Sequence, residues 1–89
     1  MSTNAGTEAI ANWRTEIDVL DERIISLLEQ RLALSLQVQR TRMREGGDRL
    51  ASDRERWIVR RYADRLGDRG ARLAGLVLEM CRGNTGRAR

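Results

Sequence analysis

The sequence predicts an all-α protein of three helices, the first of them long, that forms an intertwined antiparallel homodimer. Large apolar residues recur from residue 13 to residue 38 at alternating intervals of four and three, the repeat of one buried helix face. Glycines at 46–47 and 67 divide the rest into two shorter helices, and no stretch alternates like a strand. With 89 residues, the chain is expected to be a single helical domain, 1–89, with flexible ends at 1–11 and 84–89.

The first helix is expected to begin near residue 8 or 12, with Thr7 or Asn12 as N-cap, and to end at Glu45 before Gly46 and Gly47. At 1.5 Å per residue it would be about 50 Å long, more than so small a domain can cover. A second copy packed along the apolar line would cover it, so the sequence favours a dimer. We call this line the seam; its members are Trp13, Ile17, Leu20, Ile24, Leu27, Leu34 and Val38.

The second and third helices are bounded by capping and glycine signals. Residues 46–51 are expected to form a loop, and Ser52 then begins a helix with a capping box, because Glu55 lies three residues further on. Gly67 ends that helix, and the third runs from residue 68 or 69 to Arg82, before a frayed tail at 83–89. The expected core residues are Ile58, Tyr62 and Leu66 with Trp57 beside them, then Leu73, Leu76, Val77 and Met80.

The composition removes most catalytic chemistry. The chain has no histidine and no lysine, so all 17 basic residues are arginines, and Cys81 is the one cysteine. This set excludes a Cys–His nucleophile, a Schiff-base lysine and a P-loop, and it predicts neither a metal nor a cofactor. Arginines and carboxylates suit the electrostatic stabilisation of an anion instead.

Charge and hydropathy bear on partners and location. The net charge of +4 is compatible with nucleic-acid binding, but the arginines are interleaved with 13 acidic residues, as on a solvated helix face. No secretory signal is evident, and no apolar run is long enough to cross a bilayer. We therefore expect a cytoplasmic protein that binds neither nucleic acid nor membrane.

Arg31 interrupts the seam between Leu27 and Leu34. A guanidinium stays charged and is costly to bury unless an anion meets it, so Arg31 either pairs with an acid in the core or binds an anionic ligand. Arg42 lies eleven residues on, close to three turns, and projects within about 20° of the same helix face. Arg14 lies seventeen residues before Arg31, roughly 25 Å along the helix, so it would reach such a site only from the second copy of an antiparallel dimer.

Arg54 and Glu55 add a cation and a carboxylate at the start of the second helix, where the helix N-terminus itself favours anions. Together with Arg31 and Arg42 they predict a pocket for a small polyanion that carries a hydroxyl group. Local explanations compete with these roles. Arg14 and Arg42 are also typical of solvated helix surface, and Glu55 of a capping box.

Residues 12–83 resemble the all-helical (AroQ-type) chorismate mutases, and among them the compact actinobacterial intracellular subgroup. The resemblance is carried by the segment WRTEID at 13–18, by Arg31 with a basic residue eleven positions later, and by Arg54-Glu55 at the start of the second helix. The short length and the segment TRMREGGDRL are most like the subgroup.

The resemblance implies that the chain converts chorismate to prephenate in phenylalanine and tyrosine biosynthesis. This is a concerted rearrangement of a dianion, without proton transfer, covalent intermediate, metal or cofactor. Arg31 and the partner subunit's Arg14 would bind the substrate carboxylates, and Arg54 would support the anionic end. Arg42 would face the breaking ether oxygen, and Glu55 would accept the ring 4-hydroxyl.

Three departures from the family pattern are visible. Many members have lysine where Arg42 stands, and some place an acid at the position of Ala51. The last helix also lacks the Ser and Gln that better-studied members direct at the substrate, which predicts weak activity of the isolated protein. The subgroup is associated with activation by DAHP synthase, the first shikimate-pathway enzyme, through the C-terminal tail.

Two kinds of alternative function remain open on the sequence. The same scaffold hosts mutases for 4-amino-4-deoxychorismate and isochorismate pyruvate lyases. A non-catalytic helical interaction or nucleic-acid-binding module is the alternative from a different class. That alternative predicts binding that weakens steeply with salt and does not depend on Arg31.

Overall fold

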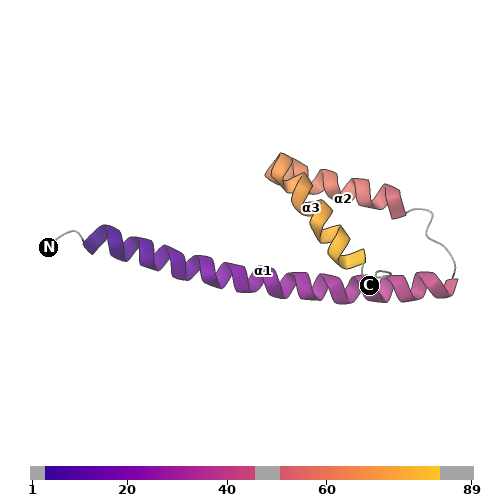
Figure 1. Ribbon diagram of the computed structural model, residues 1–89, viewed down its shortest axis with the longest axis horizontal. Helices are drawn as coiled ribbons and strands as arrows, with labels where there is room; N and C mark the ends of the chain where they lie inside the picture. The colour runs from indigo at the N-terminus through magenta and orange to yellow at the C-terminus, as the bar shows by residue number, and fades with distance from the viewer. Residues whose placement is uncertain (1–3, 46–50, 83–89) are drawn as a thin grey trace. The chain divides into compact units, whose positions relative to one another are not determined.

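The computed structural model describes residues 4–45 and 51–82, and all of them except Gly67 are helical (Figure 1). Helix α1 covers Asn4–Glu45, α2 covers Ala51–Leu66 and α3 covers Asp68–Arg82. The prediction of an all-α fold with three helices is therefore confirmed for this part of the chain. Of the loop predicted at 46–51, Ala51 belongs to α2, so this end of the prediction is wrong, and residues 46–50 lie outside the described residues. The predicted tail at 83–89 also lies outside them. The chain's contacts divide it into two compact units, Met1–Gln30 and Arg31–Arg89.

Helix α1 begins at Asn4, earlier than the sequence signals suggested. The candidate N-caps Thr7 and Asn12 both lie inside the helix, so both assignments are wrong. Three alanines within residues 5–11 explain the extension, because alanine has the highest intrinsic helix propensity. The predicted end at Glu45 is confirmed.

In the unit Met1–Gln30, the described residues belong to α1 alone. No residue of α1 is buried. The seam residues in this unit leave half or more of their surface exposed, from 50% at Leu20 to 61% at Leu27. An amphipathic helix in a protein gains most of its stability from packing, and this exposed face is the one that the predicted homodimer would cover. The homodimer remains a prediction.

In the unit Arg31–Arg89, Gly67 joins α2 to α3. Its φ of 78° lies in the left-handed region that glycine adopts without steric cost. The Gly67 amide donates to the carbonyl of Ala63 at 2.7 Å, and its carbonyl accepts from the amide of Ala71 at 3.2 Å. The backbone thus closes one helix and begins the next around a single residue, as the glycine signal predicted.

The core of this unit lies between α2 and α3. A Cβ added at Gly70 would lie 2.5 Å from the carbonyl oxygen of Tyr62 and 2.6 Å from the Cβ of Leu66, so the two helices approach as closely as glycine allows. Small and medium-sized side chains fill the rest of the contact. The buried residues are Ile58, Gly70, Ala74, Val77, Leu78 and Cys81.

The predicted core was correct for Ile58 and Val77 and wrong for the largest residues of α3. Leu73, Leu76 and Met80 are 45–64% exposed. The close approach at Gly70 turns one face of α3 toward α2, the face that carries residues 70, 74, 77, 78 and 81. The larger side chains of α3 therefore point away from α2. In α2, Tyr62 is half-buried, whereas the predicted core residues Leu66 and Trp57 are 60% and 49% exposed.

Across residues 4–45 and 51–82, no helix combines the length and apolar character needed to span a membrane.

Candidate active site

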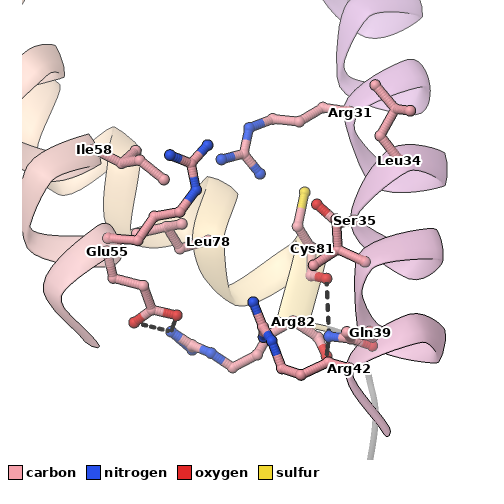
Figure 2. A pocket seen from close by; sticks show the side chains of 12 residues that line it. Arg31, Leu34, Ser35, Gln39, Arg42, Glu55, Ile58, Leu78, Cys81 and Arg82 are labelled. Atoms are coloured by element: carbon pink, nitrogen blue, oxygen red, sulfur yellow. Dashed lines mark hydrogen bonds and ion pairs between the residues drawn. The ribbon is translucent and has the colours of Figure 1, made fainter. Parts of the chain in front are cut away.

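A cavity of about 300 Å³ lies within the unit Arg31–Arg89 (Figure 2). Residues 31–42 of α1, the beginning of α2 and the end of α3 form its walls. The lining residues are Arg31, Leu34, Ser35, Val38, Gln39, Arg42, Arg54, Glu55, Ile58, Leu78, Cys81 and Arg82.

Arg31 and Arg42 both line the cavity from α1. Their spacing of eleven residues places them on one face of the helix, and Figure 2 shows both side chains leaving α1 toward the cavity. Both are half-buried. Within the described part of the chain, neither forms an ion pair with an acid, so the internal partner considered for Arg31 is not found there. Among the described residues, no carboxylate is therefore paired with these two guanidinium groups of the cavity.

Arg54 reaches the cavity from the first turn of α2. Its guanidinium carbon lies 5.4 Å from the ring centroid of Trp57, and that of Arg61 lies 4.8 Å from the same centroid. Trp57 thus supports the planar group of Arg54 by a cation–π contact at the edge of the cavity. This contact gives Trp57 a role that does not require burial.

Glu55 points across to α3 rather than back along its own helix. Nη2 of Arg82 lies 3.3 Å from Oε1 and 3.4 Å from Oε2 of Glu55 (Figure 2). The capping box predicted for Ser52 and Glu55 is therefore wrong: α2 already includes Ala51, and the Glu55 carboxylate accepts from Arg82. The side chains are 51% exposed for Arg82 and 39% for Glu55, and pairs this exposed contribute at most about 1 kcal/mol.

Gln39 connects α1 to the last turn of α3. Its Nε2 donates to the carbonyl oxygen of Arg82 at 2.8 Å and, in a longer contact, to that of Cys81 at 3.5 Å. These carbonyls belong to the C-terminal turn of α3, where a helix has no amides of its own to offer. The side chain of Gln39 supplies a donor to these carbonyls.

Several polar lining residues were not predicted from the sequence. From the sequence, Arg82 marks only the end of the third helix, and Gln39 and Ser35 have no assigned role. A signal for two of them was present, because Arg31, Ser35 and Gln39 follow one another at intervals of four, with Arg42 three residues later. These four residues form a polar stripe on α1 that includes Arg31, the residue that interrupts the seam. No such local pattern marks Arg82.

Arg14 is the one predicted site residue that does not line this cavity. It lies on α1 in the unit Met1–Gln30 and is exposed. Its predicted role from a partner subunit therefore remains a prediction.

The charges of the cavity favour a small anion. Four arginines and one glutamate line it, and four positive charges less one negative charge leave +3. Among the residues at 4–45 and 51–82, no group of three or more His, Cys, Asp or Glu side chains is placed to hold a metal ion. Guanidinium groups of this kind bind carboxylates and stabilise negative charge that develops on an oxygen atom.

The fold and the cavity define an all-helical protein with an arginine-lined site for a small organic anion. The chain belongs to the chorismate mutase type II family, which it matches over residues 13–79. Its activity is that of a chorismate mutase, an isomerase.

Relatives and a solved structure agree with this assignment. The chain is 42% identical over 77 residues to an intracellular chorismate mutase of Mycolicibacterium smegmatis. This alignment covers 86% of this chain and 74% of the relative. The chain is 41% identical over 77 residues to an intracellular chorismate mutase of Mycobacterium tuberculosis, covering 86% and 72%. A chain in the non-covalent complex of DAHP synthase and chorismate mutase from Corynebacterium glutamicum, with bound transition state analog, superposes with a TM-score of 0.83. That match is 35% identical and covers 92% of this chain and 99% of the other.

Proposed function

We propose that the cavity lined by Arg31, Arg42, Arg54 and Glu55 is the active site at which this chain converts chorismate to prephenate. The observation that supports this most directly is that α1 and α2 bring three arginines and one carboxylate to one cavity of about 300 Å³. Chorismate offers two carboxylates, which match the arginines in charge. It also offers an ether oxygen that can accept a hydrogen bond from an arginine and a ring hydroxyl that can donate one to Glu55. The reaction would belong to phenylalanine and tyrosine biosynthesis in the cytoplasm.

The arginines would act by position and charge. The ether C–O bond breaks as a C–C bond forms, in one step, so the protein need only hold the reactive chair-like conformer and stabilise its transition state. Arg31 binds one carboxylate and Arg54 supports the other anionic end. Arg42 directs its guanidinium at the ether oxygen, where negative charge grows during bond breaking. Arg42 is half-buried, and partial removal from water strengthens that interaction.

Glu55 would accept a hydrogen bond from the ring 4-hydroxyl. A carboxylate has several lone pairs, so Glu55 can keep a contact to Arg82 and still accept from the substrate. Because the Glu55 side chain is 39% exposed and lines the cavity, it is accessible to a ligand. The contact with Arg82 then bears on where the carboxylate lies in the cavity.

The proposed enzyme is a homodimer in which two long helices cover each other. The seam is uncovered in the single chain, since all seven of its members are 50–67% exposed. A second copy of α1 running antiparallel presents the same apolar line in return, which is what a self-complementary two-fold interface requires. In this arrangement the partner subunit's Arg14 completes the site by binding a substrate carboxylate.

DAHP synthase is the proposed activating partner. The Corynebacterium glutamicum neighbour was solved in complex with that enzyme, and we extend the partner to this chain. α3 contributes Leu78, Cys81 and Arg82 to the cavity, with no side-chain amide among them. The ether oxygen therefore lacks a neutral donor from α3, and the isolated chain should turn over slowly until a partner reshapes the site.

The test is to follow the loss of the chorismate diene absorbance with and without DAHP synthase. Arg31→Ala and Arg42→Ala should each lower kcat/KM by about 100- to 1000-fold, as loss of one group that stabilises transition-state charge does. Arg40→Ala is the matched control, because Arg40 lies two residues before Arg42 on the exposed face of α1 and does not line the cavity. Equal turnover by Arg42→Ala and Arg40→Ala would contradict the proposal.

The substrate is tested in the same assay. Chorismate, 4-amino-4-deoxychorismate and isochorismate are offered separately to the wild-type protein. We expect the highest kcat/KM with chorismate. A higher value with either of the other two would assign the site to a different reaction on the same scaffold.

A further inference from the structure

We propose that Gln39 is a positioning residue for the reaction, which fixes the last turn of α3 to α1 and thereby sets the direction of Glu55 through Arg82. The proposal rests on the function proposed above for Glu55. It concerns a residue that makes no chemical contribution of its own to the rearrangement.

The hydrogen bonds of Gln39 define what this side chain can do. Its Nε2 is 2.8 Å from the carbonyl oxygen of Arg82 and 3.5 Å from that of Cys81. Since both partners are acceptors, the amide must present its nitrogen to them, and this fixes its orientation. Both hydrogen bonds leave the same nitrogen and end on the backbone of α3. The amide nitrogen of Gln39 therefore faces the backbone of α3, which is the geometry of a positioning group.

Gln39 acts on the backbone of the residue whose side chain holds Glu55. Arg82 accepts from Gln39 through its carbonyl, and its guanidinium donates to both carboxylate oxygens of Glu55 at 3.3 and 3.4 Å. Figure 2 shows the three side chains in sequence from α1 across to α2. The route from α1 to the proposed hydroxyl acceptor thus consists of one backbone carbonyl and one ion pair.

The position of Arg82 matters because its ion pair with Glu55 is weak. Both side chains are more than a third exposed, so the pair by itself orders the carboxylate only slightly. Arg82 is also the last residue of α3, where helix ends fray. A donor that holds the carbonyl of this residue reduces the fraying and keeps the guanidinium opposite Glu55. This gives Gln39 an effect on substrate binding from outside the set of substrate contacts.

Two variants separate the effect of losing the hydrogen-bond donor from the effect of changing the side-chain volume. Gln39→Met keeps the length and helix propensity but has no donor, and Gln39→Glu places an acceptor against two carbonyl oxygens. Gln37→Met and Gln37→Glu are the matched controls, because Gln37 is exposed and lies about 160° around α1 from Gln39. With chorismate as substrate, we expect KM to rise roughly three- to tenfold in Gln39→Met, the effect of one lost hydrogen bond, and further in Gln39→Glu. The controls should stay within about twofold of the wild type.

The distribution of the effect between KM and kcat distinguishes positioning from simple loss of folded protein. Because Arg42 is untouched, kcat of the Gln39 variants should remain within about twofold of the wild type. A purely structural defect would lower the apparent kcat through the folded fraction and leave KM unchanged. KM does not depend on how much of the enzyme is folded, so this result remains decisive for a partly unfolded variant.

A double-mutant cycle tests the route through Arg82. In an Arg82→Ala background, Gln39→Met should raise KM by less than about twofold, since the ion pair it supports is already gone. A full additional effect, or an unchanged KM in Gln39→Met itself, would overturn the proposal. These outcomes differ from failure of the proposed function, in which Arg42→Ala would turn over chorismate as fast as the wild type.

Discussion

Gly70→Ala places a methyl group where α3 has no room for one. The added Cβ would lie 2.5 Å from the carbonyl oxygen of Tyr62, whereas ordinary contacts of a Cβ begin at 3.4 Å. The neighbouring atom belongs to the backbone of α2, so it cannot rotate away as a flexible side chain would. The two helices must separate by up to about 0.9 Å at this point, and overpacking of this kind costs roughly 1–3 kcal/mol.

Gly75→Ala is the matched control, because Gly75 lies on the same helix with nothing within 4 Å of its added Cβ. Both substitutions gain about 1 kcal/mol of helix propensity, so the difference between them isolates the packing cost. At about 4–8 °C per kcal/mol for a domain of this size, Gly70→Ala should melt at least about 4 °C below Gly75→Ala.

The assay is thermal unfolding followed by circular dichroism at one fixed protein concentration, since association would shift the midpoint. Turnover of chorismate is measured on the same samples at 25 °C. Gly70→Ala should also lower kcat/KM, because Glu55 on α2 and Arg82 on α3 face each other across the separated helices. Equal melting temperatures for the two variants would refute the reasoning about close helix packing.

Three further predictions concern the shared site, the seam and the turn. Arg14→Ala and Arg42→Ala should each be inactive. An equimolar mixture of the two variants, refolded together, should recover about a quarter of wild-type activity, because half of the dimers are mixed and each mixed dimer has one intact site out of two. No recovery would contradict a shared site. Leu20→Glu should dissociate and unfold the dimer in light scattering and circular dichroism, since it puts a charge on the seam, whereas Ala33→Glu on the far face of α1 should not. Gly67→Ala should cost roughly 1–2 kcal/mol because its φ is 78°, and an unchanged melting temperature would contradict this.

The helix ends that glycine marks could be predicted from the sequence. Gly67 ends α2 where expected, and α1 ends at Glu45 before the paired glycines. These signals are local, because a left-handed residue interrupts a helix whatever the surroundings. The N-terminus of α1 could not be placed in the same way, since Thr7 and Asn12 are acceptable inside a helix as well as before one.

The inward face of α3 could not be predicted because the helix carries apolar residues on more than one side. Size suggested Leu73, Leu76 and Met80, but contact with α2 selects the face with the smallest residues, around Gly70 and Ala74. A sequence shows which residues are apolar, whereas the distance between two helix axes decides which of them fit.

The candidate site was predictable along α1 and less so across the helices. The spacing of Arg31 and Arg42 follows from helix geometry alone, and both residues line the cavity. The partner of Glu55 lies 27 residues away on another helix, so no local pattern reveals it. For Glu55 the sequence supported a capping role, and a contact between helices took precedence.

Because no described residue of α1 is buried, the activity of each chain is expected to depend on the concentration of the protein. If the seam is covered only by a second copy, folding and association are one event, and the fraction of competent chains depends on total concentration. Below the dissociation constant, turnover per chain falls with dilution, although no contact within a chain has changed. The amount of this protein that a cell synthesises would then set the activity of each molecule as well as their number.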